Sequence, residues 1–391
     1  MNIITKENLF ISASCLELAL GILQMCQYEI SPRRFILWGF FVVYLAVACT
    51  NHYSRTEKIM LVICLGLGLL LYIFSGINTG IKAPVYIFAL KEINIKKLFQ
   101  WMLASLVAVT VGVMAASLFW DFGKKSIEDY REGFLFSGTR YSLGFAHPNV
   151  LQFLMFSILS YSLFLYGKRM TLLQYVTLGI GYAALFGVTY SRTGFIAGEL
   201  ILILAFLLRF TDKQHLNRVL LAGYILLIGT FFIFSFIVAA EFRDVKIIQM
   251  IDHMIGGRVS QLNIHSGDIQ SALPCISNWR LFSSHSNKNM YDMGYVQIFY
   301  YYGIVPAAGY FVFLFSAFGR AVKRKDKFGC LVLAGFSIYL FTESLYFSNY
   351  LTRDFMLMAA AGVWFGTEHL RIAEREWDFN ECTGKKISGS I

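Results

Sequence analysis

The sequence predicts an all-α fold, a polytopic transmembrane helical bundle of about 12 helices with one large extracytoplasmic loop. Hydrophobic residues make up 57% of its 391 residues. The mean hydropathy is +0.58, which a soluble domain of this length does not reach. The apolar residues form continuous runs, without the period-two alternation of a transmembrane barrel. Such runs satisfy their backbone polar groups inside lipid only as helices.

Twelve apolar segments reach or approach the ~20 residues that cross a bilayer as a helix. The first carries Glu17, and no small-residue cleavage site follows it, so we expect a retained helix rather than a signal peptide. The fourth is short and contains Pro84, which predicts a broken or tilted helix. The segments are 8–27, 35–50, 59–77, 80–91, 98–119, 149–166, 171–189, 193–210, 219–240, 294–318, 328–346 and 354–370.

The distribution of lysine and arginine predicts the orientation of the bundle. With the N-terminus in the cytoplasm, 20 of the 34 basic residues fall in cytoplasmic loops and tails, as the positive-inside rule requires. Most of the others lie in two long outer loops, 120–148 and 241–293, and long loops cross regardless of charge. Both termini are therefore expected inside, with 1–391 as a single integral membrane domain. The same rule accounts for the net charge of +10, so no nucleic-acid partner is expected.

The outer loop 241–293 is too short to be a domain with its own core. We expect it to form short helices that lie on the bundle as a lid. Together with other polar clusters, this loop is predicted to face outward; the clusters are 139–149, 190–194, 256–258 and 291–295. Such a convergence of polar residues on one side suits a lipid-linked, anionic, sugar-bearing substrate. None of the clusters has a Walker or metal-ligand pattern, so no metal site and no cofactor are expected.

Arg192 and Ser191 stand at the predicted start of the eighth helix. Free N–H groups and the helix dipole favour an anion there. An arginine at a helix rim can instead simply reach toward lipid headgroups. Glu199 follows two turns below on the same face, where an acid is costly unless it is paired or faces a polar cavity.

Arg140 and Arg258 are predicted loop arginines, a kind of residue that is usually just solvated. Arg258 follows two glycines, which let the backbone approach a ligand closely. Three arginines on one face of the membrane can grip a pyrophosphate through forked, charge-assisted hydrogen bonds. We therefore predict Arg140, Arg192 and Arg258 as substrate-binding residues.

The remaining candidates surround a possible proton acceptor. Asp292 can act as base toward an attacking sugar hydroxyl or can be a simple N-cap, and His285 is the competing base. Glu343 is a further candidate near the outer end of the eleventh helix. His147 and Asn149 lie at the predicted start of the sixth helix, where they can stabilise the helix start, contact the substrate or do both. Tyr295 belongs to the interfacial aromatic belt or stacks on a sugar.

In order and spacing, these motifs resemble the O-antigen and capsular-polysaccharide polymerase family, which includes the O-antigen ligases. The likeness covers roughly residues 135–310. It lies in Arg140 with the segment 144–149, in Ser191 to Gly194, in Gly257-Arg258, and in Asp292-Met293-Gly294-Tyr295 with the later Gly303.

The resemblance implies a metal-independent glycosyltransferase that uses undecaprenyl-diphosphate-linked sugars at the outer face of the bacterial plasma membrane. In such enzymes one arginine after the seventh helix and one in the large loop hold the pyrophosphate, and here Arg192 and Arg258 match them. Ligases carry a His-Asn pair eleven residues before a glycine. This chain has Asp292 eleven residues before Gly303, with Met293 in place of the asparagine, which favours a repeat-unit polymerase.

The leading hypothesis is that the chain joins lipid-linked oligosaccharide repeat units into capsular polysaccharide, exopolysaccharide or O-antigen. Its partners would be the undecaprenyl-diphosphate-linked oligosaccharide and membrane lipid, with a flippase and a chain-length regulator as candidate protein partners. One alternative is a ligase that transfers the finished glycan to another acceptor. A transporter of the lipid-linked glycan is another, although charges running through the bilayer would then be expected. The third is a non-catalytic assembly subunit.

Overall fold

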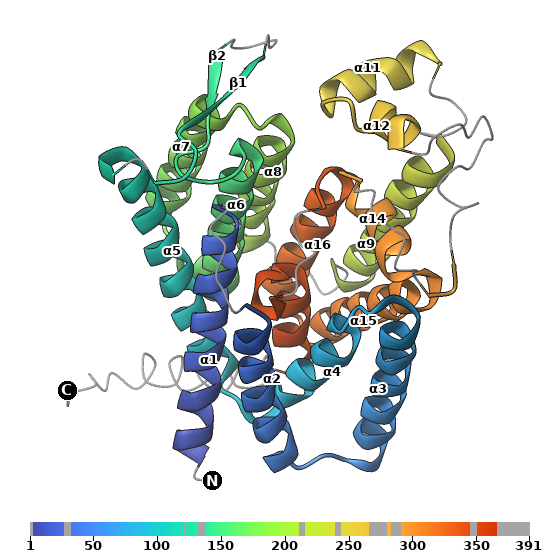
Figure 1. Ribbon diagram of the computed structural model, residues 1–391. Coiled ribbons are helices and arrows are strands. Elements are labelled where there is room, and N and C mark those ends of the chain that lie inside the picture. Colours follow the sequence, from blue (N-terminus) through green and yellow to red (C-terminus); the bar gives the residue numbers. More distant parts are fainter. Residues whose placement is uncertain are drawn as a thin grey trace.

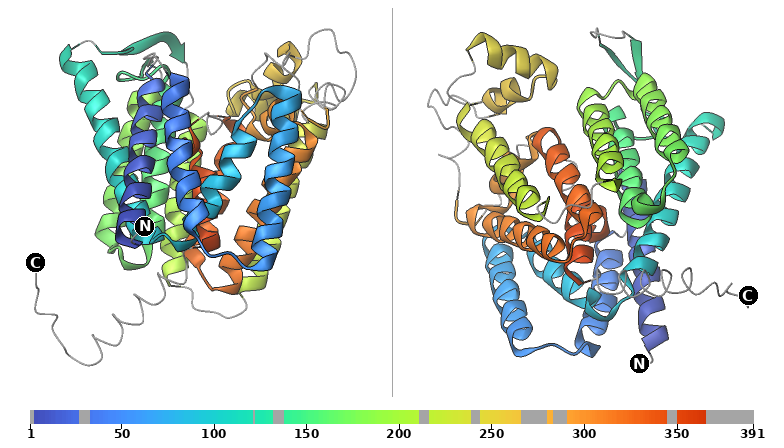
Figure 2. Two further views of the ribbon diagram at one scale, coloured as in Figure 1. Left: turned by 60° about the horizontal axis from the view of Figure 1, so that its bottom comes forward. Right: turned by 180° about the vertical axis from the view of Figure 1, so that it is seen from behind.

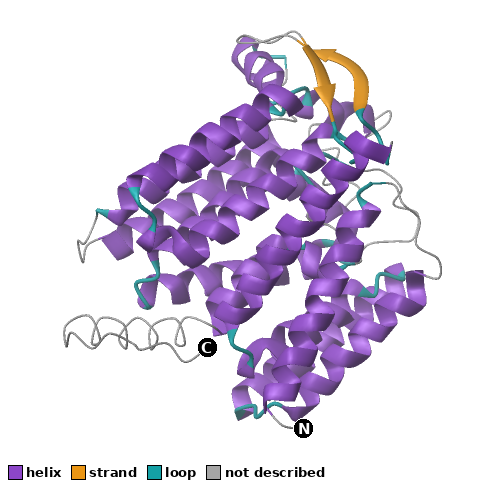
Figure 3. Cartoon of the chain, turned by 90° about the vertical axis from the view of Figure 1, so that its left-hand side faces the viewer, coloured by secondary structure: helices purple, strands orange, loops and turns teal. Residues whose placement is uncertain are grey.

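The described part of the chain is all-α, apart from one short hairpin (Figure 3). The computed structural model describes residues 3–26, 33–120, 122–131, 138–210, 216–238, 244–265, 280–282, 291–344 and 350–365. The hairpin pairs β1 (Ser126–Arg131) with β2 (Gly138–Tyr141) antiparallel, with Ile127 opposite Arg140. It lies within the predicted outer loop 120–148, where no strand was predicted.

The N-terminal half contributes five helices and a short 3₁₀ turn. They are α1 (Ile3–Gln24), α2 (Arg33–Thr50), α3 (Arg55–Ser75), α4 (Thr79–Ala89), η1 (Leu90–Glu92) and α5 (Ile95–Trp120). α4 contains Pro84 and packs against α2 and α3, while α1 packs against α2 and α5 (Figure 1). A β-carbon on Gly68 would meet the backbone of Gly80 at 2.2 Å, so glycine permits this close crossing of α3 and α4.

The C-terminal half is built on two central helices, α6 (Pro148–Tyr166) and α16 (Lys327–Thr342). Most of their residues are buried, and both pack against α8. The other elements are η2 (Gly167–Arg169), α7 (Leu172–Thr189), α8 (Arg192–Arg209), α9 (Leu216–Ile233) with its π-helical end η3 (Phe234–Val238), α11 (Lys246–Met254), α12 (Arg258–His265), α14 (Gly294–Tyr302), α15 (Ile304–Lys323), η4 (Leu351–Arg353) and the helix Phe355–Phe365.

Six of the described helical stretches are long and apolar enough to cross a bilayer, which is compatible with a membrane protein. They are Arg55–Ser75, Ile95–Trp120, Pro148–Arg169, Leu172–Thr189, Val219–Ile237 and Ile304–Lys323. Three shorter apolar helices accompany them, at Phe35–Thr50, Lys327–Thr342 and Phe355–Phe365. Each of the twelve predicted segments is helical over most of its described residues, but length and composition qualify only the six as spans.

The predicted helix 294–318 is divided in two at Gly303. Gly303 has a φ of +91°, a conformation that glycine adopts without strain, and it ends α14 and precedes α15. The first N–H groups of α15 are satisfied from outside the helix, because Ile304 donates to the Arg280 carbonyl at 2.9 Å and Val305 to that of Leu281 at 3.0 Å. The sequence did not predict this break, because the apolar run continues on both sides of Gly303.

The polar elements gather at one end of the bundle. Figure 1 shows the β1–β2 hairpin and the α11–α12 pair at the end opposite to the start of α1. Seen from behind in Figure 2, α16 lies between α8 on one side and α9 on the other, and it packs against both. The described part of the predicted loop 241–293 holds α11 and α12, two short helices, as the sequence predicted.

Candidate functional site

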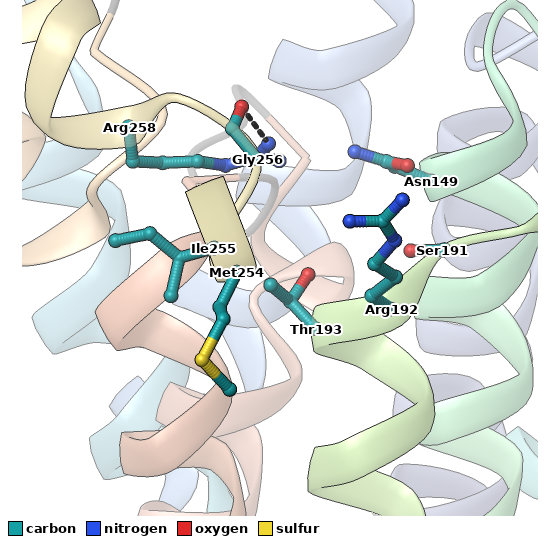
Figure 4. Close-up of a pocket in the computed structure, with 8 residues that line it drawn as sticks. All are labelled: Asn149, Ser191, Arg192, Thr193, Met254, Ile255, Gly256 and Arg258. Atoms are coloured by element: carbon teal, nitrogen blue, oxygen red, sulfur yellow. Dashed lines mark hydrogen bonds between the residues drawn. The ribbon is translucent and has the colours of Figure 1, made fainter. Parts of the chain in front are cut away.

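A small open pocket lies between the α11–α12 pair and the starts of α6 and α8. Its empty volume is about 210 Å³, including the open mouth. Figure 4 shows the Arg192 side chain extending into the gap between these two walls. The lining residues are Asn149, Ser191, Arg192, Thr193, Met254, Ile255, Gly256 and Arg258. Three of the four clusters predicted from the sequence therefore contribute to one pocket.

The start of α8 forms one wall. Tyr190 ends α7 with a φ of +48°, a left-handed conformation that is uncommon for a non-glycine residue. It turns the chain sharply, so that Ser191 becomes the N-cap of α8 and Arg192 its first residue. The Ser191 side chain is buried and does not cap the helix, and its hydroxyl has no hydrogen-bond partner among the described residues. A buried hydroxyl without a partner is costly, and here it lines a pocket at a helix N-terminus, where an anion is favoured.

Gly194 permits the close packing of this wall. A β-carbon at Gly194 would lie 2.5 Å from the Gln152 side chain of α6. The Tyr182 hydroxyl of α7 donates to the Gly194 carbonyl at 2.8 Å. The first turn of α8 is thus held between α6 and α7, with Arg192 and Thr193 directed to the pocket.

Arg258 comes from the opposite wall, where two glycines and an aspartate shape the chain. Gly256 and Gly257 both have positive φ, +76° and +81°, which forms the tight turn between α11 and α12. Asp252 of α11 then caps α12, because its carboxylate accepts from Val259 N at 2.7 Å and from Ser260 N at 3.2 Å. This capping fixes the first residue of α12, Arg258, toward α16.

The Arg258 side chain is only 4% exposed and is held by three hydrogen bonds. Its Nη2 donates to Glu343 Oε1 at 2.6 Å, Nε to the Thr342 carbonyl at 3.3 Å, and Nη1 to the Gly256 carbonyl at 3.0 Å. A guanidinium has five N–H donors. The described contacts therefore use three of them, and Arg258 still lines the pocket.

Glu343 is the centre of the polar network. It follows the last residue of α16 and is 3% exposed. Its Oε1 accepts from Arg258, from Asn149 Nδ2 at 2.9 Å and from the Thr193 hydroxyl at 3.5 Å. One carboxylate thus ties α12 to the starts of α6 and α8, across both walls of the pocket. The sequence indicated Glu343 only as one candidate among several, since its partners lie up to 194 residues away.

Burial raises the pKa of the Glu343 carboxyl to about 7. The Arg258 and Arg140 charges oppose this shift, whereas the Asp292 charge adds to it. The carboxyl therefore changes its charge near neutral pH, directly behind the pocket.

Asp292 lies beside Arg258, with 3.8 Å between its Oδ2 and Arg258 Nε. Its side chain is 42% exposed and is open to solvent. Met293, rather than Asp292, is the N-cap of α14, so the simple N-cap reading of Asp292 is wrong. A β-carbon on Gly294 would lie 2.7 Å from the Leu340 carbonyl and 2.8 Å from that of Glu343. Glycine is therefore what lets the start of α14 approach the end of α16 and bring Asp292 to the site.

Arg140 lies behind the pocket rather than in its lining. It is fully buried; its Nε donates to the Thr189 carbonyl at the end of α7 at 3.0 Å, and its Nη2 to Asn149 Oδ1 at 2.6 Å. Arg140 therefore orients Asn149, whose amide reaches both the pocket and Glu343. His147 is the N-cap of α6 and accepts from Asn149 N at 3.1 Å, with Pro148 next, as expected for a helix start.

Two other predicted residues, Tyr295 and Glu199, do not line the pocket. Tyr295 is fully buried and stacks on Phe311, so it belongs to the core. Glu199 lies next to Gly179 of α7, two turns below Arg192, and its Oε1 has no hydrogen-bond partner among the described residues. His285 lies outside the described residues. Thr193 belongs to the predicted cluster 190–194, whereas Met254 and Asp252 were missed. An aspartate four residues before two glycines was the available signal for the α12 cap.

The arrangement places Arg192 and Arg258 in the lining of an apolar-edged pocket, with the carboxylates of Glu343 and Asp292 beside Arg258. Such a site can hold an anion with two phosphoryl groups and can present a solvent-accessible carboxylate beside it. Comparisons of this chain with protein-family models, with curated proteins and with solved structures found no match.

Proposed function

We propose that this protein is a polymerase that joins undecaprenyl-diphosphate-linked oligosaccharide repeat units at the outer face of the bacterial plasma membrane. One observation carries the proposal. Residues from four distant segments bring Arg192, Arg258, Glu343 and Asp292 together at one end of a bundle of apolar helices. Binding a soluble anion would not require a membrane-spanning bundle, whereas a lipid-linked diphosphate has to be bound at the edge of the bilayer.

The diphosphate of the donor lipid would bind at the N-terminus of α8. Arg192, the Thr193 hydroxyl and the positive end of the α8 dipole would contact it from one wall. The Ser191 hydroxyl, which has no hydrogen-bond partner within the described part of the chain, supplies a further donor. Arg258 would contact the diphosphate from the other wall, through guanidinium N–H groups that are not used in its hydrogen bonds to Glu343, Thr342 and Gly256. Arg140 acts indirectly, as a positioning residue for Asn149.

In the reaction, a hydroxyl oxygen of the incoming repeat unit attacks the anomeric carbon of the growing chain. The new carbon–oxygen bond forms as the bond from that carbon to the phosphate oxygen breaks, and the electron pair leaves with undecaprenyl diphosphate. Asp292 accepts the hydroxyl proton. Arg192 and Arg258 stabilise the charge that develops on the leaving diphosphate, the kind of effect that is worth about 10²–10³ in rate for one donor.

The opposite end of the bundle supports a cytoplasmic assignment for the start of α1. Lysines there pair with acids across several helix ends, at 2.7 Å for Lys6 with Glu92 and 2.8 Å for Lys97 with Glu7. A membrane protein concentrates its basic residues on the cytoplasmic side. The pocket would then face outward, where lipid-linked repeat units are joined, and the α11–α12 pair would act as its lid.

A gel of the lipid-linked glycans from a deletion strain of the parent bacterium tests this function. The strain is complemented with the wild type, Arg258→Ala, Arg192→Ala or the control Arg55→Ala, whose exposed arginine lies at the start of α3. We expect single repeat units to accumulate in the deletion strain and with both pocket variants, and normal polymer with the control. Intact polymer left on the carrier lipid would instead identify a ligase, and an unchanged glycan profile would reject the proposal.

A further inference from the structure

The pocket has an apolar edge that the proposed chemistry does not use. Met254 and Ile255 line it together with Arg192 and Arg258. A site built only for a diphosphate and a sugar would not benefit from these side chains. Their presence indicates that the ligand has an apolar part close to its charged group.

On the α11 side, this edge continues as an exposed stripe. Ile247, Met250 and Met254 are 59%, 61% and 56% exposed, and their spacing of three and four residues puts them on one face of α11. The stripe is about 10 Å long at 1.5 Å per residue. α11 is nine residues long and is not one of the six candidate spans, so three large exposed apolar side chains on it mark an interaction surface.

On the α8 side, the face of the helix that carries Arg192 continues as another exposed stripe. Ile196 lies one turn below Arg192, and Leu200 and Ile203 follow on the same face. All three are exposed, since α6, α7 and α16 cover the other faces of α8. The two stripes meet at the pocket, where Met254 stands opposite the first turn of α8 (Figure 4).

We propose that the isoprenoid chain of the donor leaves the pocket between α8 and α11, against Ile196 on one side and the Met250–Met254 stripe on the other. This inference rests on the proposed function for the diphosphate position only. Arg192 would hold the charged group at the N-terminus of α8. The first isoprene units would then cover both stripes, and the remainder of the chain would follow the exposed face of α8 into the bilayer.

Photo-crosslinking of the full chain in nanodiscs tests the exit path. A benzoylphenylalanine is placed at position 196, at 250, or at the control position 180, where α7 exposes Ile180 at 67%. The probe is radiolabelled undecaprenyl diphosphate. We expect positions 196 and 250 to crosslink at least about tenfold more than position 180, because a chain whose diphosphate is bound is held beside these two positions at a high effective concentration.

Competition identifies which part of the probe is recognised. Unlabelled undecaprenyl diphosphate should abolish crosslinking at both positions, and geranyl diphosphate should compete far better than inorganic diphosphate. Crosslinking at only one of the two positions, equal crosslinking at 180, or equal competition by inorganic diphosphate would overturn the exit path. No glycosyl transfer is needed for this readout. Crosslinking by a protein that forms no polymer would therefore reject the proposed function alone, and polymerisation without crosslinking would reject this inference alone.

Discussion

Removal of the Glu343 carboxylate is the sharpest test of the network behind the pocket. In Glu343→Ala, the guanidinium of Arg258 loses its 2.6 Å partner while only 4% of its side chain is exposed. The amide of Asn149 loses its acceptor as well. Breaking a buried pair by removing one partner costs about 3–5 kcal/mol, because the remaining charge stays buried without compensation. The free energy of unfolding should fall by that amount.

Two further variants separate charge from hydrogen bonding. Glu343→Gln keeps an acceptor oxygen for Arg258 and Asn149, so it should cost about 1–3 kcal/mol, the difference between charged and neutral hydrogen bonds. Glu7→Ala is the matched control, since Glu7 pairs with Lys97 at 2.8 Å but both side chains are partly exposed. Exposed pairs contribute about 0–1 kcal/mol.

The assay is denaturant unfolding of the purified protein in mixed micelles at pH 8, where the Glu343 carboxyl is ionised. The expected order of stability is wild type, Glu7→Ala, Glu343→Gln and then Glu343→Ala. If Glu343→Ala is no less stable than Glu7→Ala, then Arg258 is not buried against Glu343, and the Glu343 carboxylate is not the centre of the polar network.

Three other predictions address the same residues. Because burial raises the pKa of Glu343 to about 7 in the folded state, ionising this carboxyl costs the folded state more than the unfolded chain, whose pKa is about 4.5. The free energy of unfolding of the wild type should therefore fall as the pH rises from 5 to 8, and that of Glu343→Gln should not show this slope. Asp292→Asn should lower the rate of polymerisation in vesicles by a factor of about 10²–10⁴. It should change the free energy of unfolding by no more than about 1 kcal/mol, because the Asp292 side chain is 42% exposed. Equal rates for the variant and the wild type would show that Asp292 is not the base. Gly294→Ala should destabilise the protein by about 1–3 kcal/mol by forcing α14 away from α16; Gly309→Ala, with open space around its β-carbon, is the control and should not lower stability.

Most helices were predictable because a bilayer imposes one requirement on every spanning segment. About 20 apolar residues with satisfied backbones can be read from a single chain without any tertiary information. The division at Gly303 was not predictable in the same way. It depends on N–H groups of α15 that are satisfied by the carbonyls of Arg280 and Leu281, and no local pattern reveals such partners. The β1–β2 hairpin was not predicted, because the polar composition of residues 120–148 indicated only a loop.

The sequence predicted which residues gather at the candidate site better than it predicted the role of each residue. Positions at helix ends and beside glycines indicated Arg192 and Arg258 as candidates, and both line the pocket. Arg140 was expected to grip the ligand, but it is buried against Asn149 and Thr189. Tyr295 was expected at the site and lies in the core. Burial and long-range pairing decide such roles, and both depend on how helices pack, which the order of residues along one chain does not give.

We propose that this pocket forms glycosidic bonds between lipid-linked repeat units. The most direct measurement is to reconstitute the purified full chain in vesicles with undecaprenyl-diphosphate-linked repeat units and to follow the length of the lipid-linked glycan over time. With the wild type we expect chains of two or more units and stoichiometric release of undecaprenyl diphosphate, and with Arg258→Ala we expect neither product. Vesicles in which the labelled glycan crosses the membrane while every chain remains a single unit would contradict it.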